Sequence, residues 1–166
     1  MRTLLVVYHS LTGGTRQMAE AAVDGARTAA GTGALDVRLR RATDTQPFEL
    51  LAADGYLFAT PENLAAMAGL MKDFFDRCYY PLLERIVGRP YALLVCAGTD
   101  GGNAARQLER IATGWRLRPV APPLIVRTGA DTPEAILAPK AIGAAERARC
   151  AELGATLGAG LALGIF

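Results

Sequence analysis

The sequence lacks the residues on which several common kinds of site depend. No Gly-Lys pair occurs anywhere in the chain, so a Walker-type phosphate loop is excluded, and the absence of G-x-S-x-G removes support for a nucleophile-elbow hydrolase. The three cysteines, Cys78, Cys96 and Cys150, are odd in number and have no C-x-x-C spacing. This pattern indicates neither a disulfide framework nor a zinc site, so we expect reduced thiols and no bound metal.

A surplus of one charge and a long apolar run are also missing. The 18 basic and 16 acidic residues nearly cancel, and no basic run points to a nucleic-acid surface. The first apolar run, residues 4–8, is too short for a signal peptide, and the apolar stretch 153–166 contains four glycines and is too short to span a membrane. We therefore expect a cytoplasmic protein with no nucleic-acid partner and no membrane span.

The chain does contain enough apolar residues for one core. Its 166 residues are 51% hydrophobic and 20% charged, a composition typical of a globular chain and not of a disordered one. This length fits one domain, which we place over residues 1–166.

The stretch 3–15 combines a buried strand with a loop suited to an anion. Residues 4–8 are all apolar, as in a strand covered on both faces, and a loop rich in hydroxyls and glycine leads from them into a helical pattern at 16–30. The helix dipole and the free N–H groups at a helix start favour a phosphate, and Gly13 and Gly14 let the backbone approach it. The alternative is an N-cap with an ordinary polar turn.

Strands and helices alternate along the chain, which implies right-handed crossovers and a parallel sheet between two helical layers. We predict an α/β three-layer sandwich with a five-stranded parallel sheet in the order 2-1-3-4-5. Its ligand crevice would lie near strands 1 and 3, where the winding reverses. The predicted strands are residues 4–8, 35–39, 55–59, 91–97 and 120–128, with 35–39 and 120–128 at the edges, and the predicted helices are 16–30, 47–53, 70–80, 105–115 and 141–157.

Three loops follow the carboxyl ends of strands 1, 3 and 4, at residues 10–15, 60–68 and 97–103. The second is predicted as a loop because the residue before Pro61 avoids the helical region and Asn63 suits a turn. Since the carboxyl ends of parallel strands share one edge of the sheet, we expect the three loops to converge on one crevice.

Motifs in all three loops resemble those of one protein family. The first loop carries S-x-T-G-x-T, and Thr60-Pro61 is followed by G-x-x-K-x-F-x-D-R at 69–77. The third loop contains Gly-Thr-Asp-Gly-Gly at 98–102. Together they resemble flavodoxins and the flavodoxin-like NAD(P)H-dependent FMN reductases over residues 2–128, which implies a flavodoxin-like fold. The last 40 residues or so match only in being helical.

The resemblance implies that the protein binds FMN and carries hydride from NAD(P)H, a transient donor, to a quinone, azo or similar small acceptor. Because the cofactor carries the chemistry, no catalytic side chain is assigned. An alternative is a one-electron carrier that docks on a redox partner, and another is a flavin-free binding domain. The implied FMN-binding residues are Ser10, Leu11, Thr12, Gly13, Gly14, Thr15, Thr60, Pro61, Glu62, Asn63, Leu64, Ala97, Gly98, Thr99, Asp100 and Gly101.

Several single residues have two interpretations. His9 is either a proton-transfer group or a packed strand-end residue. Arg40 and Arg41 are either a contact for the 2′-phosphate of NADPH or a solvated pair. Glu62 either faces the flavin or caps a turn, and Cys96, inside an apolar strand, is expected to be an inert buried thiol.

An excess of apolar residues near the C-terminus predicts a homo-oligomer, with a dimer as the simplest form. Residues 157–166 offer more apolar side chains than a sheet of this size is expected to cover, and the segment 79–83 adds aromatic residues. The predicted loops contain no aromatic side chain to stack on a flavin, and a neighbouring subunit could cover the ring instead. The alternative is a monomer in which the tail forms the last core helix.

Overall fold

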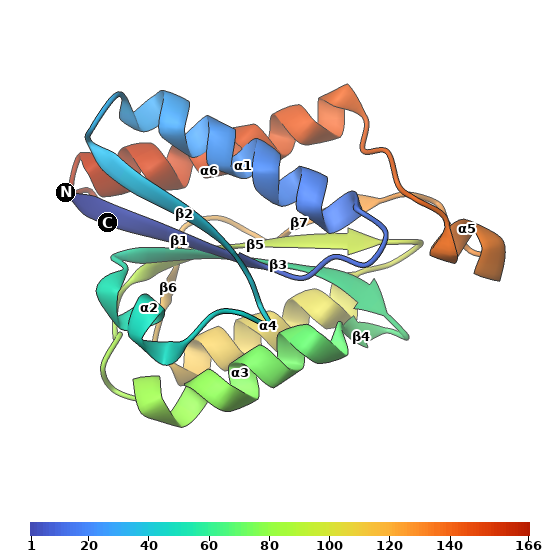
Figure 1. Ribbon diagram of the computed structural model, residues 1–166, viewed down its shortest axis with the longest axis horizontal. Helices are drawn as coiled ribbons and strands as arrows, with labels where there is room; N and C mark the ends of the chain where they lie inside the picture. Colours follow the sequence, from blue (N-terminus) through green and yellow to red (C-terminus); the bar gives the residue numbers. More distant parts are fainter.

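A twisted parallel sheet separates two layers of helices in the computed structural model, which describes residues 1–166 (Figure 1). One face is covered by α1 (Gly14–Ala30) and α6 (Ala144–Ala162), and the other by α2 (Pro47–Ala52), α3 (Gly69–Leu82) and α4 (Gly102–Gly114). The short helix α5 (Pro133–Leu137) projects beyond the sheet at the end where the strands finish.

The sheet confirms the predicted α/β architecture and strand order. Its path is β2-β1-β3-β5, and both β6 and β7 pair with the far side of β5. Of the predicted fifth strand, 120–128, only residues 124–127 form a strand, β7, and the short β6 precedes it at residues 118–119. The prolines Pro122 and Pro123 lie between these pieces, where they interrupt no ladder. The strands are β1 (Arg2–Tyr8), β2 (Leu35–Arg41), β3 (Gly55–Asn63), β4 (Ala66–Met67), β5 (Pro90–Ala97), β6 (Arg118–Pro119) and β7 (Leu124–Arg127).

The prediction that residues 60–68 form a loop is wrong. Strand β3 continues through Pro61 to Asn63 and turns back into β4, forming a small antiparallel hairpin. A proline keeps the preceding residue extended, which a strand tolerates as well as a loop does. The turn residues Leu64 and Ala65 have positive φ angles of 50° and 62°, as a tight hairpin requires, but neither is the glycine or asparagine that normally signals such a turn.

The two helical layers pack against the sheet in different ways. On the α3/α4 side, aromatic rings fill the core, with Phe58 in contact with Phe75 at 5.3 Å between centroids and Tyr79 stacked on Trp115 at 5.7 Å. On the other side α1 and α6 approach closely through small residues. A Cβ at Gly154 would fall on the Ala22 carbonyl, so glycine is required there.

The expectation that residues 157–166 offer more apolar side chains than the sheet can cover is wrong for part of this segment. Leu157 and Leu161 are buried in α6 against the sheet, as in the monomer alternative. Leu163 and Ile165 remain exposed beyond the helix, and so does Tyr80 at the end of α3. Each helix is too short or too polar to cross a membrane.

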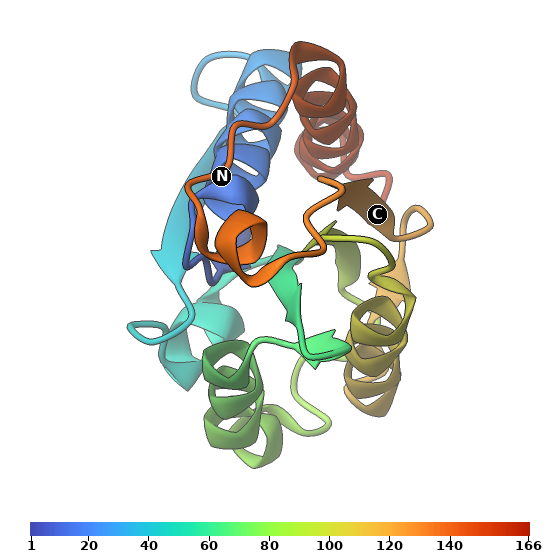
Figure 2. The same cartoon turned by 90° about the vertical axis from the view of Figure 1, so that its right-hand side faces the viewer.

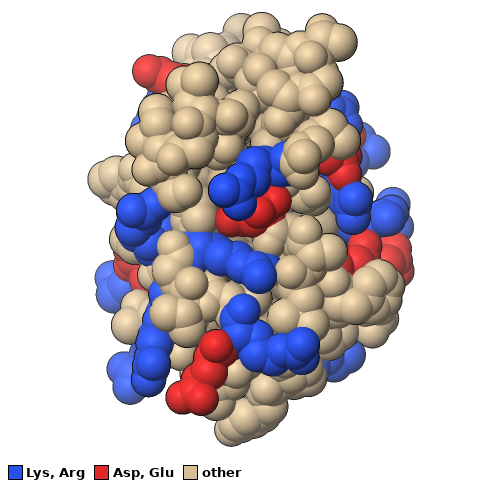
Figure 3. All heavy atoms as spheres, turned by 90° about the vertical axis from the view of Figure 1, so that its left-hand side faces the viewer, with Lys and Arg blue, Asp and Glu red and all other residues tan.

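The end of the molecule where the strands begin is rich in arginine (Figure 3). Arg2 starts β1, Arg118 starts β6 and Arg89 immediately precedes β5. Arg2 pairs with Asp54 at 2.7 Å, and Arg89 donates to the carbonyls of residues 50, 51 and 53 and to the Tyr56 hydroxyl.

Candidate functional site

The opposite end of the sheet carries the three loops expected to converge. Viewed toward that end, the start of α1, the β3–β4 hairpin and the α5 segment surround the ends of the strands (Figure 2). Together they enclose a cavity of about 480 Å³, within the size range of small-molecule sites.

The first loop makes a tight turn at the start of α1. Gly13 is left-handed, with φ 94°, and its N–H donates to the Ser10 hydroxyl at 3.2 Å. Helix α1 therefore begins at Gly14, two residues earlier than the apolar pattern predicts, and points its first N–H groups into the cavity region. No acidic side chain lies in the first turn, so the positive end of the helix dipole is not offset.

Thr15 is the most unusual residue of this loop. It is 1% exposed, and its hydroxyl oxygen has no hydrogen-bond partner. The Cys96 thiol lies close enough to influence it, but no hydrogen bond of acceptable geometry joins the two groups. An unpaired buried hydroxyl normally costs free energy, which makes Thr15 a candidate binding group.

Gly14 and Cys96 lie against each other at the floor of the cavity. A Cβ at residue 14 would lie 2.7 Å from Cys96 Sγ, so only glycine fits. Burial raises the pKa of the Cys96 thiol, and the Lys140 ammonium and Thr15 hydroxyl oppose this effect. The buried thiol is as expected, but its position in the wall of the cavity was not predicted from the sequence.

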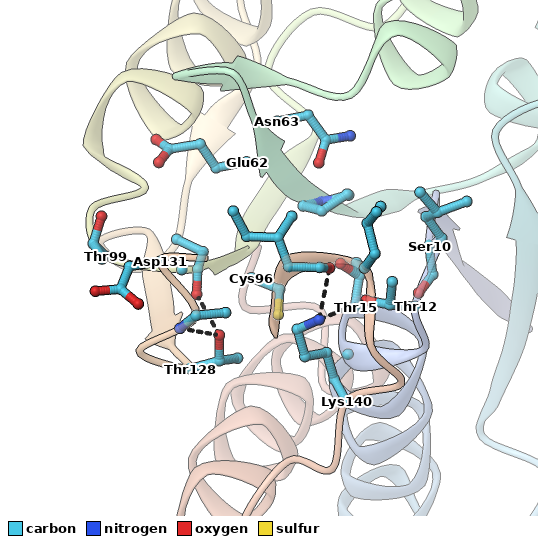
Figure 4. Close-up of a pocket in the computed structure, with 18 of the residues that line it drawn as sticks. Ser10, Thr12, Thr15, Glu62, Asn63, Cys96, Thr99, Thr128, Asp131 and Lys140 are labelled. Carbon is cyan, nitrogen blue, oxygen red and sulfur yellow. Dashed lines mark hydrogen bonds between the residues drawn. The ribbon is translucent and has the colours of Figure 1, made fainter. Parts of the chain in front are cut away.

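The β3–β4 hairpin forms the second wall. Helix α4 holds it in place, since Asn103 Nδ2 donates to the Ala65 carbonyl at 2.6 Å and Gln107 Oε1 accepts from the Met67 N–H at 2.9 Å. Glu62 on this wall lines the cavity, and its buried Oε2 atom has no partner (Figure 4). Thr60 lies beneath the wall, where its hydroxyl accepts from the Ala68 N–H and does not line the cavity.

The third loop runs along the opposite side. A Cβ at Gly98 would clash with the Ala130 carbonyl, because the segment after β7 crosses directly above it. Asp100 and Gly101 lie outside the cavity. The Asp100 carboxylate accepts from the Gly102 N–H, and Gly101, with φ 92°, begins α4.

A segment from the C-terminal third supplies the remaining wall, and its place there was not predicted from the sequence. Gln17 ties this segment to the first loop: its Nε2 atom donates to the Gly13 and Lys140 carbonyls, and its Oε1 atom accepts from the Ile142 N–H. Lys140 Nζ donates to the carbonyls of Ala135, Ile136 and Ala138 and lies 3.4 Å from Thr12 Oγ1.

The cavity thus unites most of the predicted residues with an unpredicted set (Figure 4). Gly13 does not line this cavity but lines a neighbouring one on the other side of the first loop. The charged groups of the main cavity are Lys140 near the first loop and Glu62 and Asp131 on the other walls. The predicted residues that line it are Ser10, Leu11, Thr12, Gly14, Thr15, Pro61, Glu62, Asn63, Leu64, Ala97, Gly98 and Thr99, and the unpredicted ones are Cys96, Thr128, Ala130, Asp131, Ile136, Leu137 and Lys140.

The remaining residues with two interpretations lie around this end. His9 follows β1 and is half-buried, and burial lowers the pKa of His9, with the positive charge of Arg41 lowering it further. Arg40 is paired with Glu49 at 2.9 Å, whereas Arg41 makes no ion pair or side-chain hydrogen bond. On helix α3, Arg77 pairs with Asp73 at 2.8 Å and also donates to the Ala42 and Thr45 carbonyls.

Comparisons with known proteins agree with this arrangement. The chain is 34% identical over 134 residues, covering 68% of its length, to a protein of Acidithiobacillus ferrooxidans named NAD(P)H dehydrogenase (quinone). It is 35% identical over 108 residues, covering 62% of its length, to a flavodoxin of Aquifex aeolicus. The chain spans 66% and 55% of the length of these two relatives.

Solved structures show the same fold. A flavodoxin from the domain Archaea superposes with a TM-score of 0.71 at 19% identity, over 94% of this chain and 96% of that one. The sequence profile of the NADPH-dependent FMN reductases matches residues 48–131, which include the β3–β4 hairpin, β5 and the third loop. The chain has a flavodoxin-like fold and belongs to the NADPH-dependent FMN reductase family.

Proposed function

We propose that the cavity holds FMN, with the phosphate on the loop 10–15. The observation that carries this assignment is the Thr15 hydroxyl, buried and unpartnered at the start of α1. A phosphate oxygen there would accept its hydrogen bond and would interact with the helix N–H groups and dipole. Ser10, Thr12 and Lys140 line the same part of the cavity, and Gly14 leaves room for close approach.

The two walls above this loop suit a flat ring. In our proposal, residues 61–64 of the hairpin and residues 97–99 of the third loop flank the isoalloxazine, while Thr60, Asp100 and Gly101 hold these walls in shape. No aromatic side chain lines the cavity. One face of the ring is therefore left for a second ligand, which favours a reductase that must admit both a donor and an acceptor.

FMN bound in this cavity would supply the hydride- and electron-transfer chemistry between NAD(P)H and a small acceptor such as a quinone or azo compound. The chain's own part is to bind, orient and exclude water. Rigid backbone donors cost no reorganisation during the reaction, and the glycine-rich loops supply them. No side chain has to transfer a proton for the hydride step, so no catalytic residue is assigned.

The test is anaerobic reduction of the FMN-loaded protein by NADPH and NADH, followed by addition of a quinone. We expect fast reduction by a nicotinamide cofactor and ping-pong kinetics, in which donor and acceptor use the site in turn. Absence of flavin binding, or bound flavin that neither cofactor reduces, would contradict the proposal.

A flavodoxin-type electron carrier is the second candidate, and the 35% identity to the Aquifex aeolicus flavodoxin favours it. Stepwise chemical reduction separates the two functions. A carrier accumulates a stable one-electron reduced form and does not react with NADPH. A reductase passes directly to the two-electron reduced form.

We also propose a homodimer whose second subunit covers one side of the cavity mouth, at Leu64 and Ile136, and leaves Leu11 and Leu137 open. Four exposed aliphatic residues line the cavity: Leu11 (72% exposed), Leu64 (102%), Ile136 (49%) and Leu137 (68%). A group of exposed apolar side chains around a site is typical of an interface. Light scattering tests this: a mass near that of the 17.5 kDa chain would refute the dimer. The cytoplasmic location stays a prediction.

A further inference from the structure

A second cavity lies beside the first, on the other side of the loop 10–15. Its volume is about 510 Å³, and the two cavities share four lining residues, Ser10, Leu11, Thr12 and Leu137. A ligand that extends from one cavity to the other would therefore pass over the edge of the loop 10–15 and over Leu11 and Leu137, whose side chains are both largely exposed.

The charged side chains that line the second cavity are all basic. Arg16 lies in α1 and Arg41 in β2, the titratable His9 follows β1, and no acidic residue lines the cavity. The pKa of His9 is lowered by burial first and by Arg41 second, which is consistent with a positive potential inside the cavity. An anion bound there would meet the positive charge of two guanidinium groups from separate elements, and its own charge would favour protonation of His9.

The guanidinium groups of the second cavity make almost no hydrogen bonds or ion pairs with the rest of the protein. Arg41 makes no ion pair and its side chain donates no hydrogen bond, and Arg16 has only a loose pair with Glu20 at 3.8 Å between two half-exposed side chains. The neighbouring Arg40 is different, because its Nε atom donates to Glu49 Oε1 at 2.9 Å. A free arginine in a cavity can bind a phosphate through two parallel hydrogen bonds.

The remaining lining suits a flat organic group. Leu11, Leu70, Leu137 and Pro139 provide apolar surface, and Tyr8 adds an aromatic side chain. The lining therefore combines a basic side with an apolar side, which matches a phosphorylated nucleoside better than a free inorganic anion.

We propose that the second cavity binds the phosphorylated adenosine half of NADPH, with the 2′-phosphate on Arg41. This inference rests on the proposed function, since the nicotinamide of the same molecule must reach the first cavity. The diphosphate bridge would pass over Leu11 and Leu137. NADH lacks the 2′-phosphate, so Arg41 is the residue that would distinguish the two cofactors, while Arg16 adds charge without selecting between them.

Binding of 2′,5′-ADP to the FMN-loaded protein tests the site directly. His9 is the only histidine, so its imidazole signals in an NMR pH titration report on this cavity alone. We expect 2′,5′-ADP to bind and to raise the pKa of His9, because a nearby dianion stabilises the imidazolium. Arg41→Gln should weaken binding about 10- to 100-fold, the loss of a charge-assisted pair. Arg40→Gln, the matched control, should keep wild-type affinity.

Kinetics supply a second measurement. In Arg41→Gln the ratio of KM for NADPH to KM for NADH should rise about tenfold or more, and in Arg40→Gln it should not change. Equal effects of the two variants would overturn the proposal, as would a His9 signal that does not respond to 2′,5′-ADP, or inorganic phosphate binding as tightly as 2′,5′-ADP. Because FMN uptake is measured beforehand, a protein that binds FMN but fails these tests refutes only the donor site.

Discussion

The polar groups at the two ends of the sheet differ in whether they have hydrogen-bond partners. At the end where the strands begin, Arg89 satisfies three carbonyls and the Tyr56 hydroxyl, and Asp54 accepts from both Arg2 and the Thr3 N–H. At the end where they finish, Thr15 Oγ1 and Glu62 Oε2 are buried without partners. The polar groups named at the first end hold the fold together, whereas these two oxygen atoms at the second end make no hydrogen bond to the protein.

This difference predicts which substitutions lower the stability of the fold and which lower only the affinity for a ligand. A buried polar group that already has partners costs free energy when it is removed, because its partners are left unsatisfied. A buried polar group without partners costs nothing to replace by an apolar group of the same shape, except in the bound state. The following variants use this contrast.

Arg89→Met is expected to have the largest effect on the fold. It removes the side-chain donor to the carbonyls of residues 51 and 53 and one of the donors to Leu50, whose carbonyl still accepts from the Tyr56 hydroxyl and the Ala53 N–H. The free energy of unfolding should therefore fall by about 2–3 kcal/mol. Urea denaturation measures this value. The FMN dissociation constant, measured under native conditions, should stay within about twofold of wild type. A large loss of affinity would show that the two ends are coupled.

Thr15→Val is the reverse case. The valine methyl replaces a hydroxyl that has no partner, so the free energy of unfolding of the apoprotein should be unchanged or higher. FMN affinity should fall by about 1–3 kcal/mol, one charge-assisted hydrogen bond. Flavin fluorescence titration gives the affinity, and Thr156→Val on α6 serves as the control, with no change expected. Unchanged affinity in Thr15→Val would place the phosphate elsewhere.

Asp54→Asn is expected to have a smaller effect that depends on pH. Burial tends to raise the pKa of Asp54, but the hydrogen bonds from Arg2 and the Thr3 N–H and the charges of Arg2 and Arg89 outweigh it and hold the pKa below the ordinary 3.8. The carboxylate therefore stabilises the fold above that value, and its contribution is lost as the pH falls through the lowered folded-state pKa. The variant should be destabilised by about 1 kcal/mol or less at pH 7. As the pH falls, the variant should lose less stability than the wild-type protein does, which urea denaturation at several pH values would reveal.

Lys72→Met should have the smallest effect. Its ammonium lies 2.6 Å from Asp76, but both side chains are more than half exposed, so we expect a loss below about 0.5 kcal/mol and no change in FMN affinity. Thermal unfolding would measure it. A change comparable to that of Arg89→Met would mean that solvent-exposed pairs carry stability in this protein.

The sequence was sufficient to predict the sheet and the first loop, for local reasons. The uniform apolar run of β1 and the alternation of β2 indicate a buried and an edge strand, and a hydroxyl-rich, glycine-rich turn must follow where β1 ends. The positions that need glycine for close approach, Gly14 and Gly98, also lie within motifs that are visible in the sequence.

The rest of the site could not be predicted because it depends on contacts between distant segments. Lys140 reaches the first loop through Gln17, and the two residues are 123 positions apart. Nothing in the composition of residues 128–140 shows that this segment crosses above Gly98. The β3–β4 turn was missed for another reason, since Leu64 and Ala65 adopt left-handed conformations that tertiary contacts from α4 support.

The central claim is that the loop 10–15 is a phosphate site completed by a ligand. The most direct measurement is titration of the apoprotein with FMN and with riboflavin, which differ only in the phosphate. We predict that FMN binds at least about 100-fold more tightly, since several charge-assisted hydrogen bonds are lost with riboflavin, and that Thr15→Val reduces this ratio. Equal affinity for the two flavins, or the same ratio in the variant, would contradict the account.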